Sequence, residues 1–112
     1  MENILIIGAS GGIGAALAMT AQGNVTALSR AVDGLDVTDP ISVDRILGKL
    51  DGPFDSIIVA IGVLGTPEKS LSAIDADAML NVLRVNAVGP ALILRHVPRL
   101  LAAGGRVAVL SA

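Results

Sequence analysis

The chain has 112 residues and a formal net charge of −2, which fits one domain over residues 1–112. Acidic and basic residues are mixed along it, so neither a nucleic acid nor a charged membrane surface is expected as a partner. Cysteine is absent and His96 is the single histidine, which argues against disulfides, thiolate chemistry and a metal site. No uninterrupted apolar run reaches the ~18 residues that span a bilayer. The first residues lack the basic region of a signal peptide, so a cytoplasmic protein is expected.

The expected elements alternate from the start of the chain. A strand over residues 4–7 is followed by a helix over 13–22 and a second strand over 25–29. Asp39 and Pro40 form an N-cap and first-turn pair, which begins a helix that runs to about residue 50.

The second half of the chain repeats the pattern. A third strand over 56–60 leads into a loop over 62–72, and a long helix then begins near residue 75. The Gly104-Gly105 pair is expected to end this helix before a last strand over 106–111. Hydrophobic residues make up 53% of the chain and are mostly Val, Ile, Leu and Ala, as in a buried parallel sheet. The alternation predicts an α/β, Rossmann-type doubly wound parallel sheet.

A glycine-rich turn lies between the first strand and the first helix, where Gly8, Gly12 and Gly14 have the spacing G-x-x-x-G-x-G. Gly8 lets the chain turn sharply, Gly12 leaves room for a pyrophosphate, and Gly14 lets the helix pack closely on the sheet. The helix that follows directs free N–H groups and its positive end toward phosphates, and Ser10 adds a hydroxyl donor. The alternative is a glycine-rich turn that binds nothing.

Four short motifs follow one another along the chain. "GASGGIG" (8–14) resembles the cofactor turn of the short-chain dehydrogenase/reductase family, and "LDVTD" (35–39) resembles the Asp-Val segment of that family, which contacts the adenine. "VNAVGP" (85–90) resembles the long-helix segment with the family's Asn, and "GGRVAVLSA" (104–112) resembles the strand that leads to its catalytic Ser. The sequences of these motifs are most similar to those of the C-factor-like members of the family.

The resemblance implies an oxidoreductase that transfers hydride between a nicotinamide cofactor and a small carbonyl or alcohol. It implies dinucleotide contacts from the turn, the adenine-side pair and the segment after the third strand: Gly8, Ser10, Gly11, Gly12, Ile13, Gly14, Asp36, Val37, Ala60, Ile61 and Gly62. The family usually has Asn-Asn-Ala-Gly after the third strand, whereas residues 59–62 read Val-Ala-Ile-Gly. The hydrogen bonds that those Asn side chains make in relatives are therefore not available from these positions.

The residues at the end of the second strand indicate which dinucleotide is bound. A carboxylate there selects NAD through the ribose 2′-hydroxyl, whereas an arginine pairs with the 2′-phosphate of NADP. Ser29 and Arg30 occupy the place, and no acid follows until Asp33. The sequence therefore favours NADP over NAD, the alternative being that Arg30 is a solvated surface residue.

The long helix contains Pro90 four residues after Asn86. Because proline has no N–H, it cannot bond the Asn86 carbonyl, and the helix is expected to kink there. The matching Asn of the family helps to hold a water in the proton relay, and the resemblance gives Asn86 this role. The alternative is that Pro90 only shapes packing. His96 is expected to be a half-buried helix residue rather than a catalyst.

The family's proton donor is absent from this chain. Catalysis there needs a Tyr-x-x-x-Lys pair and a Ser, but the chain has no tyrosine, and Lys49 and Lys69 precede the last strand. Ser111 is the candidate serine. The sequence resembles the N-terminal, cofactor-binding portion of a longer enzyme and predicts no turnover by the isolated chain. The alternatives are a non-catalytic dinucleotide sensor and an interaction module, and the apolar strand over 106–111 favours a homo-oligomer.

Overall fold

The computed structural model describes residues 1–65 and 69–110, so Ser111 lies outside the described residues. Its strands form one parallel sheet and are β1 (Asn3–Ile7), β2 (Asn24–Leu28), β3 (Phe54–Val59) and β4 (Leu101–Val109). The strand order is β2-β1-β3-β4, which places β1 between β2 and β3. Ile4 accordingly pairs with Val25 on one side and with Ser56 on the other.

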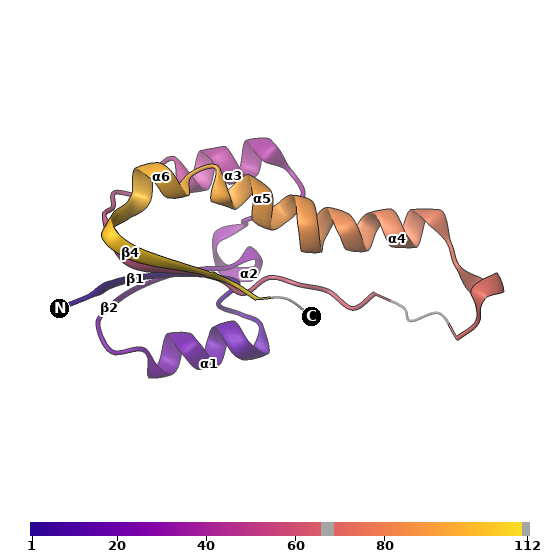
Figure 1. Cartoon of the computed structure of the whole chain (residues 1–112), viewed down its shortest axis with the longest axis horizontal. Helices are drawn as coiled ribbons and strands as arrows, with labels where there is room; N and C mark the ends of the chain where they lie inside the picture. Colours follow the sequence, from indigo (N-terminus) through magenta and orange to yellow (C-terminus); the bar gives the residue numbers. More distant parts are fainter. Residues whose placement is uncertain (66–68, 111–112) are drawn as a thin grey trace.

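Helices lie on both faces of this sheet (Figure 1). They are α1 (Gly12–Thr20), α2 (Arg30–Asp33), α3 (Pro40–Leu47), the 3-10 turn η1 (Leu71–Ala73), α4 (Ala76–Leu83), the π-helical segment η2 (Arg84–Val88), α5 (Gly89–Leu94) and α6 (Val97–Leu100). The helix α1 covers one face, while α3, α5 and α6 cover the other (Figure 1). The predicted α/β, doubly wound Rossmann-type sheet is confirmed.

The predicted start of α3 is confirmed in detail. Pro40 is the first residue of the helix, and the carboxylate of Asp39 accepts a hydrogen bond of 3.0 Å from the Ile41 N–H. The side chain thus satisfies one of the backbone donors that a helix start leaves free.

The predicted end of the long helix is wrong. The last helical residue is Leu100, and β4 begins at Leu101 rather than after the Gly104-Gly105 pair. Along β3, Phe54 pairs with Leu101, but Ser56 pairs with Arg106, so β4 carries extra residues as a bulge. Gly104 has a φ of 74° there, a left-handed conformation that glycine adopts without strain. The two glycines therefore shape an irregular strand instead of a helix end.

The main core lies between the sheet and the α3–α5–α6 layer. Its fully buried side chains come from the strands and from those helices: Leu5, Ile7, Val43, Leu47, Ile57, Val59, Ile93 and Leu100. Burying each of these aliphatic side chains contributes about 1.5–3 kcal/mol. Ile93 and Leu100 belong to this core, so the segment between α5 and α6 is fixed against α3.

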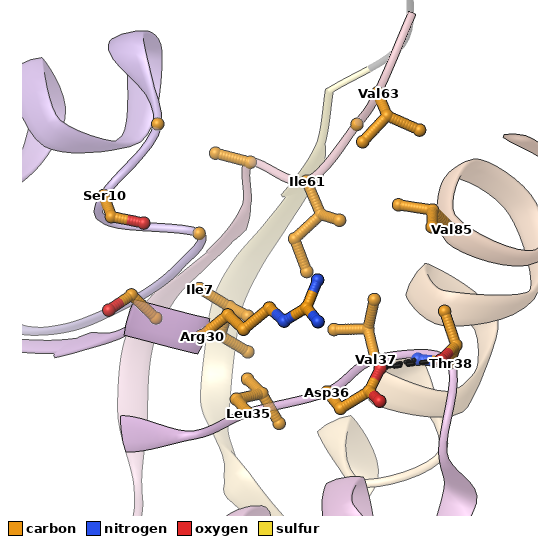
Figure 2. Close-up of a pocket in the computed structure, with 15 residues that line it drawn as sticks. Ile7, Ser10, Arg30, Leu35, Asp36, Val37, Thr38, Ile61, Val63 and Val85 are labelled. Carbon is orange, nitrogen blue, oxygen red and sulfur yellow. Dashed lines mark hydrogen bonds between the residues drawn. The ribbon is translucent and has the colours of Figure 1, made fainter. Parts of the chain in front are cut away.

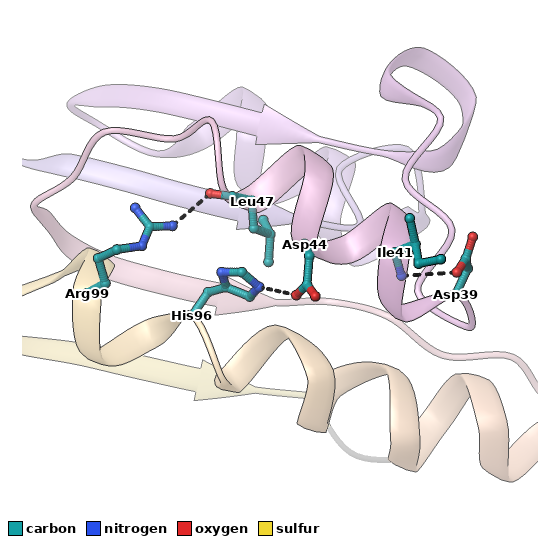
Figure 3. Close-up of polar contacts among 6 residues, drawn as sticks. All are labelled: Asp39, Ile41, Asp44, Leu47, His96 and Arg99. Carbon is teal, nitrogen blue, oxygen red and sulfur yellow. Dashed lines mark hydrogen bonds and ion pairs between the residues drawn. The ribbon is translucent and has the colours of Figure 1, made fainter.

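Polar contacts add to the packing of α3 against the C-terminal helices (Figure 3). His96 Nε2 lies 2.8 Å from Asp44 Oδ1, and the His96 side chain is only 16% exposed. The Arg99 guanidinium donates to the Leu47 and Leu50 carbonyls at 2.9 and 3.0 Å, which satisfies acceptors at the end of α3. His96 therefore has a structural contact and is partly buried, in line with the half-buried position that the sequence predicts.

The helical stretch Ala76–Leu94 extends beyond the end of the sheet (Figure 1). Met79, Leu80 and Leu83 in α4 are each about half exposed. The stretch has 19 residues and, by length and composition alone, is long and apolar enough to cross a membrane. This stretch contains no uninterrupted apolar run of that length, because polar residues interrupt an otherwise apolar helix.

Candidate functional site

A cavity of about 290 Å³ opens at the carboxyl ends of β1, β2 and β3 (Figure 2). The chain leaves β1 toward β2 on one side and returns through β3 on the other side of β1. In open α/β sheets the crevice at such a reversal of strand order is where ligands bind.

The glycine-rich turn forms one wall of the cavity. Gly8 has a φ of 93°, and a Cβ atom at this residue would collide with the carbonyl oxygen of Ala60. The Gly11 N–H closes the turn by donating to the Gly8 carbonyl at 3.2 Å, and a Cβ at Gly14 would collide with the same carbonyl. Gly14 thus lets α1 approach the turn, rather than the sheet as predicted. At Gly12 a Cβ would meet nothing within 4 Å, so the space in front of it is open.

The end of β2 forms a second wall. Ser29 is buried, and its Oγ accepts a hydrogen bond of 3.1 Å from the Val32 N–H. The Ser29 N–H in turn donates to the carboxylate of Asp33 at 2.8 Å. The guanidinium of Arg30 points into the cavity between Ile61 and the Asp36 segment (Figure 2). In the described part of the chain it forms no ion pair with a carboxylate.

Asp36 supplies a negative charge opposite Arg30. The Thr38 hydroxyl donates to Asp36 Oδ1 at 2.6 Å, and the Thr38 N–H donates to the same oxygen at 3.0 Å. These hydrogen bonds lower the pKa of Asp36, and the positive charge of Arg30 acts in the same direction against the opposing effect of partial burial. Asp36 is therefore a carboxylate at neutral pH and can accept hydrogen bonds from a ligand.

Asn86 holds the segment after β3 in place. Its Oδ1 accepts a hydrogen bond of 2.7 Å from the Val63 N–H, and its Nδ2 donates to the Val63 carbonyl at 2.8 Å. A Cβ at Gly62 would lie 3.6 Å from that Oδ1, an ordinary contact. The side chain thus joins η2 to the wall of the cavity that Val63 and Val85 line.

Near Pro90, where the sequence predicts a kink, the helix contains the π-helical segment η2. The Gly89 N–H donates to the carbonyl of Arg84, five residues earlier, and Pro90 follows as the next residue without an N–H. The segment includes Asn86, so the irregular turn and the side-chain contact to Val63 occur together.

Most of the cofactor contacts predicted from the sequence line this one cavity: Gly8, Ser10, Gly11, Ser29, Arg30, Asp36, Val37, Ala60, Ile61 and Gly62. Gly12, Ile13 and Gly14 lie beside it in the first turn of α1 and do not line it. The lining residues that the sequence analysis missed are Ile7, Leu35, Thr38, Val63 and Val85. Three of them had a signal, because Leu35 and Thr38 lie inside the "LDVTD" motif and Val85 begins the "VNAVGP" motif.

Several solved structures resemble this chain closely in fold. A crystal structure of a small-chain dehydrogenase matches with a TM-score of 0.86 at 27% identity, covering 99% of this chain and 60% of that chain. A small-chain dehydrogenase in complex with NADPH matches with the same TM-score and identity, and 51% of that chain is covered. A carbonyl reductase from Pseudomonas aeruginosa PAO1 matches with a TM-score of 0.77 at 26% identity, and 62% of that chain is covered.

The chain thus spans between 51% and 62% of the length of these three structures. No protein-family model and no curated protein matches it. The chain is similar in fold to small-chain dehydrogenases, and its parallel sheet has a cavity at the carboxyl edge. These observations support a relationship between this chain and the short-chain dehydrogenase/reductase family.

Proposed function

We propose that this chain binds NADP(H) as the dinucleotide-binding portion of a short-chain dehydrogenase/reductase of the C-factor-like type. The observation that carries the proposal is the meeting of the glycine turn, Arg30 and Asp36 around one cavity at the reversal of strand order. The NADPH complex of a small-chain dehydrogenase with the same fold supports this choice of ligand.

The residues present fit such a cofactor. Gly8 and Gly14 leave a backbone cradle that side chains would fill, and open space faces Gly12, so a pyrophosphate can approach the turn. The Arg30 guanidinium points into the cavity without a carboxylate partner in the described residues and would pair with the 2′-phosphate. Asp36 would accept hydrogen bonds from the adenine. When bound, the cofactor supplies the nicotinamide that gives or takes hydride.

Asn86 has two roles in this proposal. Its side chain holds Val63, so the segment after β3 keeps its place beside the cofactor. Its main-chain carbonyl receives no hydrogen bond from Pro90, which has no N–H, and it would hold a water of the family's proton relay.

The isolated 112-residue chain is not expected to catalyse hydride transfer. It contains no tyrosine, and Lys49 and Lys69 both precede β4. The only histidine, His96, is engaged by Asp44, and neither residue lines the cavity. The substrate, in a protein that also supplies the Tyr-x-x-x-Lys pair, would be a small carbonyl compound. Location in the cytoplasm and homo-oligomer formation are part of the same proposal.

A binding experiment tests the choice of cofactor. Calorimetry of the chain with NADP⁺ and NAD⁺ is expected to show tighter binding of NADP⁺, and Arg30→Asp is expected to reverse the order. A hydrogen bond to a charged group contributes about 1.5–3 kcal/mol, so the preference should exceed about tenfold. Arg45→Asp is the matched control, since it makes the same charge change on α3 at a residue outside the cavity. Equal affinities of the unmodified chain would contradict the NADP assignment.

A second candidate function is an interaction module. It is favoured by the exposed apolar side chains of α4, namely Met79, Leu80 and Leu83, and by the partly exposed Val107 and Val109 of β4. Replacing Leu80 and Leu83 by Gln separates the two functions. Loss of self-association with unchanged NADP⁺ binding would mean that the two surfaces act independently.

A further inference from the structure

The side chains of Ser29 and Asp33 each accept a hydrogen bond from a backbone N–H at the start of the short helix α2. The Ser29 side chain accepts from the Val32 N–H, while the Ser29 N–H donates to the Asp33 carboxylate at 2.8 Å. This reciprocal pattern is a variant of the capping box, with the acid one residue later than usual. Ser29 and Arg30 line the cavity, whereas Asp33 is exposed and does not line it.

The capping contacts fix the main chain on both sides of Arg30. The Gly34 N–H donates to the Arg30 carbonyl at 3.0 Å, and Gly34 has the left-handed φ of 69°. A helix of four residues is not stable by itself, so its geometry depends on such contacts. The Arg30 side chain begins in this segment and reaches into the cavity (Figure 2). The direction in which the Arg30 side chain leaves the main chain therefore depends on the hydrogen bond between the Asp33 carboxylate and the Ser29 N–H.

The hydrogen bond from the Ser29 N–H also engages the carboxylate of Asp33, the acidic residue that follows Arg30 most closely in the chain. Asp33 is the first acid after β2, and a carboxylate offered to the ribose at this edge would favour NAD. Because its Oδ2 accepts from the Ser29 N–H, this carboxylate is held by the backbone instead of being directed into the cavity.

We propose that Asp33 is a positioning residue for cofactor selectivity, which acts through the Ser29 N–H to hold Arg30 ready for a 2′-phosphate. The inference rests on the proposed NADP function. Ordering a flexible side chain before binding removes about 0.5–1.5 kcal/mol from the cost of immobilising it, and this corresponds to a change of up to about tenfold in affinity.

The test compares Asp33→Ala and Asp33→Asn in the 112-residue chain by calorimetry with NADP⁺ and NAD⁺. Asp33→Ala removes the acceptor and is expected to weaken NADP⁺ binding by up to about tenfold with NAD⁺ binding unchanged. Asp33→Asn keeps an acceptor oxygen and is expected to retain the preference for NADP⁺. Asp75→Ala is the control, because Asp75 caps α4 through the Ala78 N–H and lies outside the cavity.

Each alternative outcome is distinct. If both Asp33 variants bind NADP⁺ more tightly, Asp33 acts only as a repelling charge, and the inference is wrong. If Asp33→Ala weakens NAD⁺ binding, the carboxylate contacts the ribose directly, which also overturns it. Should Asp33→Ala fail to fold, loss of the preference in a folded Asp33→Asn variant overturns it as well. An unmodified chain without any preference for NADP⁺ contradicts the proposed function itself.

Discussion

Asn86→Ala tests how the wall of the cavity after β3 is held. The substitution removes two hydrogen bonds to the Val63 backbone, of 2.7 and 2.8 Å. At about 0.5–1.5 kcal/mol for each bond, the pair contributes about 1–3 kcal/mol, and the lower half of this range applies because the contact is exposed. We therefore expect the free energy of unfolding to fall by about 1–2 kcal/mol.

Alanine also favours a helix more than asparagine does, and a control corrects for this difference. Asn81 lies in α4 and is exposed, so Asn81→Ala makes the same change without affecting Val63. Urea unfolding of both variants gives the difference that the Val63 contact makes. Binding of NADP⁺ by Asn86→Ala should also weaken, since Val63 lines the cavity. Equal stabilities of the two variants, with unchanged binding, would refute the role given to the Asn86 side chain.

Three further predictions concern the turn, the adenine side and the isolated chain. Gly12→Val should abolish NADP⁺ binding by calorimetry and leave thermal unfolding nearly unchanged, because a Cβ there meets no atom within 4 Å; retained binding would move the ligand away from this turn. Thr38→Val removes the main cause of the lowered pKa of Asp36 and should reduce stability at pH 7 by about 1 kcal/mol. A lowered folded-state pKa stabilises the protein above the unfolded pKa, so the difference between Thr38→Val and wild type in urea unfolding should shrink as the pH falls below about 4, and a difference that persists would contradict this cause. The chain should not oxidise NADPH with small aldehydes or ketones, and turnover by the pure chain would contradict this prediction. Sedimentation should show self-association through the edge strand β4, where Val107 and Val109 are partly exposed, and a monomer at high concentration would contradict it.

The parts of the fold that follow from local chemistry could be predicted from the sequence. The buried β-branched runs predicted β1 and β3, and the Asp39-Pro40 pair predicted the start of α3, because capping involves residues that are adjacent in the chain. The end of the long helix could not be predicted in this way. The Gly104-Gly105 pair has the composition of a helix end, but pairing with β3 makes it part of a bulge.

In the candidate site, too, the features set by short sequence motifs could be predicted, and those set by contacts between distant residues could not. The glycine turn and the residues after β2 were found because their chemistry lies within short motifs. The contact between Asn86 and Val63 joins residues 23 positions apart, and nothing near Val63 in the sequence marks it as a partner. Contacts of this kind depend on tertiary structure and become visible only when the chain is folded.

A crystal structure of the chain with NADP⁺ tests the central claim most directly. The account predicts the pyrophosphate against the Gly8–Gly14 turn, the 2′-phosphate on the Arg30 guanidinium and the adenine beside Asp36. Gly12, which borders open space, should lie close to the pyrophosphate. A bound dinucleotide outside this cavity, or a 2′-phosphate directed away from Arg30 into solvent, would contradict the account.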